Sequence, residues 1–318
     1  MSKFAGPGMA AKSAVGASGS GPARRELRVA GMRIALINSG LGLLAAAAEL
    51  HRLRPDADLV LAMDPDGMPW GPRTPDDIAA RSLAAARAAV ALRPDVLVFA
   101  CNTGTVHAIG ALRAEFEPAI PVVGTVPAIK PAAAQNDRVA IWATVATTAS
   151  EYQRRLIADF AGSARVTAVA CPGLADAVDA GDEAGTRAAV ALAASRTPDD
   201  CQAVVLGCTE YELAADLIGA ALPGVTLFRS APAVAAQALR RANSGEANGA
   251  AKRDGEVGAG REVGAGREVG RVPEASESRP AGTVRVLLSG RHADLPAAAL
   301  RYREGRLLAA LAFDREPA

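Results

Sequence analysis

Two of the four cysteines follow apolar segments in the same way, and their thiols are the groups most suited to chemistry. Val96–Ala100 runs directly into Cys101, and Val204–Leu206 runs through one glycine into Cys208. Each cysteine is followed within two residues by a threonine. A thiol at a helix start has its thiolate favoured by backbone N–H groups and by the helix dipole. We therefore predict that both thiols have lowered pKa values.

The remaining cysteines and the nearest histidine give a weaker signal. Cys171 follows an apolar strand without a polar cluster, and Cys201 precedes its strand, so we interpret both as packing residues. Lining of a pocket is the alternative for Cys171. His107, one turn into the helix predicted after Cys101, is a candidate substitute base, although capping or packing is more typical there. No cysteines have zinc-site spacing, and without an export signal we expect free thiols in a cytoplasmic protein.

The composition argues against several classes of partner. The formal net charge is +1, from 35 basic and 34 acidic residues, so no global field favours nucleic acid or anionic lipid. No apolar run reaches the roughly 18 residues that span a membrane. Hydrophobic residues make up 50% of the chain and aromatic residues only 3%, so alanine, valine and leucine must form the core. Such a core suits alanine-rich helices packed on valine-rich strands.

Short β-branched segments alternate with longer amphipathic stretches through most of the chain. This alternation predicts an α/β fold with parallel sheets that are covered by helices on both faces. We expect two doubly wound lobes, and a single closed barrel is the alternative. The expected strands are Arg33–Ile37, Leu59–Ala62, Val96–Ala100, Val122–Gly124, Val139–Trp142, Val166–Val169, Val204–Leu206, Thr226–Phe228 and Val284–Leu288. Helical patterns include Asp76–Leu92, Ser150–Phe160, Thr186–Ala194 and Tyr211–Ala221.

Two low-complexity segments interrupt this pattern. The first is rich in Ala, Gly, Ser and basic residues, and we expect a disordered arm rather than an organelle transit sequence. The second repeats Val-Gly-Ala-Gly-Arg-Glu from Val257 and from Val263 and has no periodic apolar face to bury. The predicted organisation is an arm at 1–31, lobe 1 at 32–127, 225–242 and 283–312, lobe 2 at 128–224, and a disordered linker at 243–282.

Small polar side chains or thiols follow several of the predicted strands, and the chemistry of parallel sheets gathers at such strand ends. In order and context these turns resemble the aspartate/glutamate racemase family, glutamate racemases in particular. The resemblance extends from Met32 to about Arg241 and includes the last strand. It rests on Asn38-Ser39-Gly40-Leu41-Gly42, Pro69-Trp70-Gly71, Ala100-Cys101-Asn102-Thr103, Ala143-Thr144 and Gly207-Cys208-Thr209-Glu210-Tyr211.

The resemblance implies two pseudo-symmetric lobes with a small acidic amino acid held between them. It also implies a two-base mechanism, in which Cys101 and Cys208 act on opposite faces of the α-carbon and the direction decides which is the base. Asn38 and Glu210 match positions that assist the cysteines. Hydroxyls, amides and backbone N–H groups suit carboxylate binding. The implied substrate-binding residues are Asn38, Ser39, Trp70, Gly71, Asn102, Thr103, Thr144 and Thr209.

The residues themselves also favour chemistry without a cofactor. An amino-acid α-proton is weakly acidic, and pyridoxal enzymes overcome this with an electron sink held by a lysine. Lys130, the only lysine between the two cysteines, is flanked by prolines, and Gly40-Leu41-Gly42 falls short of a dinucleotide fingerprint. We therefore expect no cofactor and a cleft that stabilises the carbanion electrostatically and excludes water.

Three positions depart from the pattern of glutamate racemases. Asn38 stands where they usually carry Asp, Glu210 where they carry His, and Trp70 where they carry Tyr. Asparagine cannot accept a proton, so Asn38 can orient its neighbours but cannot serve as a base. Glu210 can accept a proton, but its charge should disfavour a thiolate at Cys208.

The leading hypothesis is a racemase that interconverts L- and D-glutamate and supplies D-glutamate for peptidoglycan. One alternative is a relative that acts on aspartate or on another small acid such as a hydantoin, maleate or an arylmalonate. The other is a catalytically impaired racemase-like protein that binds a ligand. A homodimer is compatible with all three.

Overall fold

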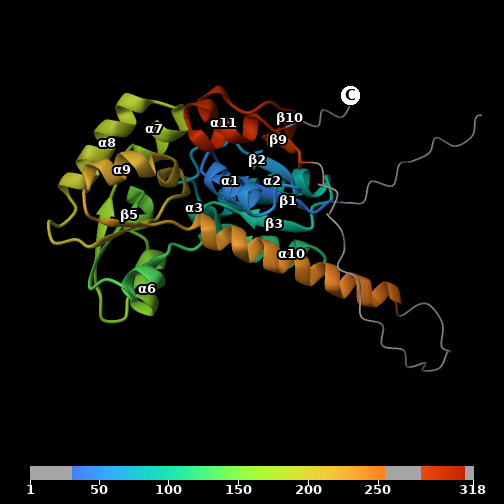
Figure 1. Ribbon diagram of the computed structural model, residues 1–318, viewed down its shortest axis with the longest axis horizontal. Helices are drawn as coiled ribbons and strands as arrows, with labels where there is room; N and C mark the ends of the chain where they lie inside the picture. Colours follow the sequence, from blue (N-terminus) through green and yellow to red (C-terminus); the bar gives the residue numbers. More distant parts are fainter. Residues whose placement is uncertain (1–30, 255–280, 312–318) are drawn as a thin grey trace, which may run out of the picture. The chain divides into compact units, whose positions relative to one another are not determined.

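The computed structural model describes residues 31–254 and 281–311, which belong to one compact unit (Figure 1). The predicted arm up to residue 30 and the predicted linker beyond residue 254 lie outside the described residues. Two separate sheets organise the described chain, so the predicted pair of doubly wound α/β lobes is confirmed and the single closed barrel is wrong. We call the parts built on the first and second sheets lobe 1 and lobe 2.

Lobe 1 contains a sheet whose described strands follow the order β10-β9-β2-β1-β3-β4. The pairings between neighbours are parallel except at the edge, where β10 is antiparallel to β9. The strands are β1 Arg33–Asn38, β2 Asp58–Met63, β3 Val96–Phe99, β4 Val122–Gly124, β9 Val284–Leu288 and β10 Arg291–Ala293. Strand β10 was not predicted, because it consists of Arg-His-Ala without an apolar pattern and follows a tight turn in which Ser289 and Gly290 have positive φ.

Alternation along the strands explains why helices cover both faces of this sheet. In β1, Ile34 and Leu36 pack into one core cluster, whereas Ala35 and Ile37 pack into another. The first cluster joins the sheet to α1 Leu43–Leu53, α10 Ala231–Asp254, η2 Ala297–Arg301 and α11 Arg303–Ala309. The second joins it to α2 Pro75–Val90 and α3 Asn102–Phe116.

Lobe 2 contains a sheet whose described strands are all parallel, in the order β6-β5-β7-β8. These strands are β5 Arg138–Ala143, β6 Arg165–Ala170, β7 Ala203–Leu206 and β8 Thr226–Phe228. One face packs on α7 Leu174–Ala180, α8 Glu183–Ser195, the 3-10 helix η1 Thr209–Ala214 and α9 Ala215–Ala221. The other packs on α4 Ile129–Ala133 and α6 Glu151–Phe160, and α5 Val145–Thr148 follows β5.

Two predicted boundaries differ from the structure. The segment 225–242 was assigned to lobe 1, but β8 pairs with β7 in lobe 2, and only the following helix α10 packs on lobe 1. This helix also continues to Asp254, past the predicted start of the linker at residue 243. Alanine has the highest helix propensity, and this segment contains several alanines. None of the helices in the described ranges is long and apolar enough to cross a membrane.

Candidate active site

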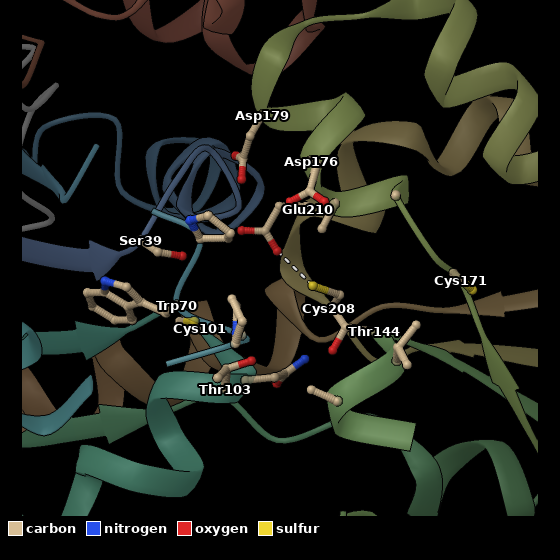
Figure 2. Close-up of a pocket in the computed structure, with 18 of the residues that line it drawn as sticks. Ser39, Trp70, Cys101, Thr103, Thr144, Cys171, Asp176, Asp179, Cys208 and Glu210 are labelled. Atoms are coloured by element: carbon tan, nitrogen blue, oxygen red, sulfur yellow. Dashed lines mark hydrogen bonds between the residues drawn. The ribbon is translucent and has the colours of Figure 1, made fainter. Parts of the chain in front are cut away.

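A cavity of about 400 Å³ lies between the two lobes, at the carboxyl ends of their parallel strands. Figure 2 shows the side chains that line it, with Cys101 contributed by lobe 1 and Cys208 by lobe 2. The main polar and thiol residues of the lining are Ser39, Cys101, Asn102 and Thr103 from lobe 1, and Thr144, Cys171, Asp176, Asp179, Cys208 and Glu210 from lobe 2. Trp70 and Gly71 complete the lobe 1 side.

Cys101 is the N-cap residue of helix α3, and its sulfur accepts a hydrogen bond from the Gly104 N–H at 3.4 Å. Gly104 packs so closely on the ring of Phe99 that a Cβ atom would overlap it. Burial, and then the charge of Glu210, raise the pKa of Cys101 to about 12, against the lowering effect of hydrogen bonds from Gly104 and Ser39.

Cys208 is the N-cap residue of η1, but its side chain makes no capping hydrogen bond. Its thiol instead donates to Glu210 Oε2 at 2.8 Å, the contact drawn as a dashed line in Figure 2. Burial raises the pKa of Cys208 well above its ordinary value, and the charge and hydrogen bond of Glu210 raise it further. The predicted unfavourable effect of Glu210 on a Cys208 thiolate is therefore confirmed.

The prediction that both thiols have lowered pKa values is wrong. Both cysteines are at helix starts as expected, but they are only 6% and 8% exposed, and loss of hydration disfavours the charged form. In addition, η1 is a short 3-10 helix that places a carboxylate two residues after Cys208. Burial and neighbouring charge depend on tertiary structure, and neither could be predicted from the apolar strands that precede the two cysteines.

Asn38 lies behind the wall of the cavity rather than in its lining. It is fully buried, and its Nδ2 donates to the Ala100 carbonyl at 2.8 Å, to Thr209 Oγ1 at 3.2 Å and to Glu210 Oε1 at 3.3 Å. Its Oδ1 accepts from the Ser39 N–H at 2.6 Å. Thr209 is likewise buried outside the lining. Neither predicted substrate-binding side chain reaches the cavity, and together they join the end of β1 to η1.

Two carboxylates near Cys208 were missed by the sequence analysis. Asp176 and Asp179 both lie on α7 and both line the cavity, so the statement that no polar cluster follows Cys171 is wrong. Their spacing of three residues, on a helix directly after a strand end, was the available signal. Asp179 Oδ1 accepts from the Leu41 N–H at 2.7 Å. Burial and then the charge of Glu210 raise the pKa of Asp179 to about 8.

Glycines in the turn after β1 let these carboxylates approach the start of helix α1. A Cβ atom at Gly40 would overlap the Asp179 carboxylate, and one at Gly42 would overlap Glu210 Oε1, Thr209 Oγ1 and Asn38 Nδ2. The positive end of a helix dipole stabilises negative charge at this point. The N-terminus of α1 in lobe 1 therefore receives the acidic groups of lobe 2.

Asn102 and Trp70 form part of the lobe 1 wall. Asn102 Nδ2 donates to the Gly207 carbonyl at 2.6 Å, and its buried Oδ1 has no hydrogen-bond partner within the described chain. A ligand donor such as an ammonium group could satisfy that oxygen. The indole N–H of Trp70 donates to Asp64 at 3.0 Å, which fixes the ring beside Gly71.

The other candidate residues either line the cavity with their polar groups bonded elsewhere or lie outside the lining. Thr144 lines the cavity, but its hydroxyl caps α5 by accepting from the Thr147 N–H at 3.2 Å. Cys171 is among the lining residues, with its thiol directed to the Val169 carbonyl at 3.5 Å. Cys201 and His107 lie outside the lining, and His107 is exposed. Among the described residues, no group of His, Cys, Asp and Glu could hold a metal ion.

Comparison with known proteins identifies the family. The sequence profile of the Asp/Glu/Hydantoin racemases matches residues 36–238, a segment that carries both cavity cysteines. The chain belongs to this racemase family. A glutamate racemase of Herpetosiphon aurantiacus is 38% identical over 213 residues, which span 65% of this chain and 83% of that protein. A glutamate racemase of Pseudomonas putida is 34% identical over 213 residues, spanning 65% and 80%.

Solved structures of racemases share the two-lobe fold. Glutamate racemase of Escherichia coli, in complex with L-glutamate and the activator UDP-MurNAc-Ala, superposes with a TM-score of 0.66 at 25% identity. That match covers 86% of this chain and 92% of the E. coli chain. Glutamate racemase of Aquifex pyrophilus has a TM-score of 0.53 at 27% identity, covering 65% and 82%.

Proposed function

We propose that this racemase interconverts L- and D-glutamate by transferring protons to and from Cys101 and Cys208. The observation that carries the proposal is that the two thiols, each placed after an equivalent strand, line one cavity from different lobes. Curated relatives of 38% and 34% identity are glutamate racemases, which supports the choice of substrate.

In the proposed reaction one sulfur, as thiolate, removes the α-proton, and the bonding electrons remain on the substrate as a carbanion stabilised by its carboxylate. The other sulfur, as thiol, donates a proton to the opposite face and becomes a thiolate. General acid–base groups of this kind contribute roughly 10²–10⁴-fold each. The buried positions of Cys101 and Cys208 support the exclusion of water that a carbanion requires.

Substrate binding is assigned to polar groups of the lining. Asn102 Oδ1 is an acceptor for the α-ammonium group, because it is buried and has no partner within the described residues. The Ser39 and Thr103 hydroxyls and the backbone at Gly71 are proposed to bind the carboxylates. Thr144 contributes through its position at the start of α5. Glu210 assists Cys208 through direct contact, whereas Asn38 acts only by positioning Ser39 and Glu210.

We also propose that the enzyme acts in the cytoplasm. Two reactive thiols remain reduced in the cytoplasm, and the cysteines of the described chain are free. There the product D-glutamate would enter peptidoglycan synthesis. A homodimer and the lack of any cofactor remain predictions.

The test is incubation of the purified protein with L-glutamate in D2O, followed by optical rotation and by NMR of the α-position. We expect loss of rotation together with solvent deuterium at the α-carbon. Absence of exchange with both glutamate and aspartate would refute an acidic amino-acid racemase.

A second candidate is a family member that acts on another small acid, and the acidic lobe 2 wall favours a substrate with less negative charge than glutamate. Asp176, Asp179 and Glu210 face the ligand space, and the described lining contains no Lys, Arg or His to balance them. A panel of aspartate, hydantoins, maleate and arylmalonates distinguishes these substrates. Thermal stabilisation by D-glutamate without any exchange would instead indicate a catalytically impaired binding protein.

A further inference from the structure

The two cavity sulfurs take part in hydrogen bonds of opposite direction. Cys101 Sγ accepts, from the Gly104 N–H at 3.4 Å, and hydrogen bonds from the backbone and hydroxyl of Ser39 also favour its thiolate. Cys208 Sγ donates, to Glu210 Oε2 at 2.8 Å. Surroundings that donate to sulfur stabilise a thiolate, whereas a carboxylate acceptor requires the proton of a thiol.

The Cys208–Glu210 contact belongs to a set of hydrogen bonds that all reach the Glu210 carboxylate from donor groups. Oε1 accepts from Asn38 Nδ2 at 3.3 Å, and Oε2 accepts from the Thr209 hydroxyl at 3.3 Å as well as from Cys208. Donors therefore converge on both oxygens. Hydrogen bonds from several donors stabilise a carboxylate over a carboxylic acid.

The neighbouring carboxyl groups fit this assignment. Asp179, a half-buried carboxyl at the start of α1, has a pKa raised to about 8 by desolvation and by the charge of Glu210. Asp179 can therefore hold a proton near neutral pH. Cys101 and Tyr211 are further titratable groups that interact with Cys208, and the exposed Asp176 lines the same cavity.

We propose that Cys208, beside the Glu210 carboxylate, holds its proton more firmly than Cys101, and that Cys101 is the thiol that first loses its proton to solvent and then acts as the base that starts the turnover. The inference rests on the proposed two-thiol function and deepens it. The Cys101 thiolate forms an S–H bond as the substrate C–H bond breaks, and Cys208 gives its proton to the opposite face. The product leaves with Cys101 as thiol and Cys208 as thiolate. Repulsion between the Cys208 thiolate and Glu210 then favours return of the proton to Cys208.

The asymmetry has a limited kinetic signature. The enantiomer whose α-hydrogen faces Cys101 reacts with the more readily formed arrangement, a Cys101 thiolate and a Cys208 thiol, whereas the other requires the opposite protonation of the two sulfurs. Because enantiomers have equal free energies, kcat/KM must be the same in both directions. The difference therefore appears in kcat and KM separately, and most directly in the reactivity of the thiols themselves.

Alkylation of the full-length protein by iodoacetamide at a fixed pH near about 8 tests the proposal, with each cysteine followed by peptide mass spectrometry. We expect Cys101 to react at least about tenfold faster than Cys208. Glu210→Gln keeps the shape of the side chain and removes its charge, so it should accelerate Cys208 about tenfold or more and Cys101 by a smaller factor. Asp176→Asn is the matched control, a cavity carboxylate removed without touching the Cys208–Glu210 contact.

A faster reaction at Cys208 in the unmodified protein would overturn the assignment. So would equal acceleration of both cysteines in Glu210→Gln, or equal effects of Glu210→Gln and Asp176→Asn on Cys208. The alkylation rates do not depend on turnover. Failure of the thiol assignment is therefore distinguishable from failure of the proposed racemisation, which the exchange in D2O reports.

Discussion

The two walls of the cavity have similar architecture but different charge. Each wall places a cysteine after a buried parallel strand, Cys101 after β3 and Cys208 after β7. The lobe 1 lining is uncharged, whereas the lobe 2 lining carries Asp176, Asp179 and Glu210 (Figure 2). A pseudo-symmetric scaffold can therefore place two thiols at equivalent positions, while the residues around each thiol make the two chemically unequal.

The difference has a structural basis in the start of helix α1. Its glycine-containing turn belongs to lobe 1 but receives carboxylates from lobe 2, at the Leu41 N–H and beside Gly42. The acidic side chains of lobe 2 are therefore in contact with the opposite lobe, and the Leu41 N–H partly offsets the effects of burial and of Glu210 on the pKa of Asp179. The pKa values of the cavity carboxyl groups therefore depend on the contact between the two lobes.

The largest expected effect is the loss of either thiol. We expect Cys101→Ala and Cys208→Ala each to reduce racemisation at least about 10³-fold, because a proton must be handled on both faces of the α-carbon. Enantiomer-resolved chromatography measures the rate. Cys201→Ala removes a thiol outside the cavity lining and is the control, expected to retain activity. Substantial activity in either cavity variant would contradict the requirement for a thiol on each wall of the cavity.

The next effect concerns the contact between the lobes. Gly42→Ala places a methyl group against Thr209, Asn38 and Glu210, with an ordinary helical φ of −58° at that position. We expect a loss of about 1–3 kcal/mol in the free energy of unfolding, measured by urea denaturation, together with reduced activity. The control is Gly110→Ala in α3, where nothing lies within 4 Å of the added atom and a gain of about 0.5–1 kcal/mol is expected. Equal effects of the two substitutions would contradict the close contact at Gly42.

A smaller effect should appear in the pH dependence of stability. The pKa of Asp179 is raised from 3.8 to about 8 in the folded protein, so between these values the folded state binds a proton that the unfolded state has lost. Stability contributed through this group is present below the lower value and declines as pH rises toward the upper one. Asp179→Asn, which keeps an acceptor for the Leu41 N–H, should therefore gain stability relative to the wild type between about pH 4 and about pH 8. A constant difference across that range, measured by denaturant titrations, would contradict the raised pKa.

The sequence was sufficient for the strand ends and insufficient for side-chain direction and charge. Cys101, Asn102 and Thr103 line the cavity as expected, because parallel strands bring their carboxyl ends to one edge. Asn38 is directly before Ser39 in sequence, yet it points into the contact between the lobes. Which of two adjacent polar residues faces a cavity depends on packing that no local pattern encodes.

The charge of the lobe 2 wall was predictable only in part. Glu210 was recognised because it lies two residues after Cys208, within the segment that resembles the racemase family, but Asp179 lies on a helix whose neighbour in space is the turn after β1. The raised pKa values of the thiols had the same origin, since burial by the opposite lobe exceeds the local effect of a helix start.

The most direct test of the central claim is a crystal structure of the wild-type protein with D-glutamate bound. We expect the α-carbon to lie between the sulfurs of Cys101 and Cys208, which should be within contact distance of it on opposite faces. A ligand bound with both sulfurs on the same side of the α-carbon, or with either thiol turned away from it, would contradict the proposed mechanism.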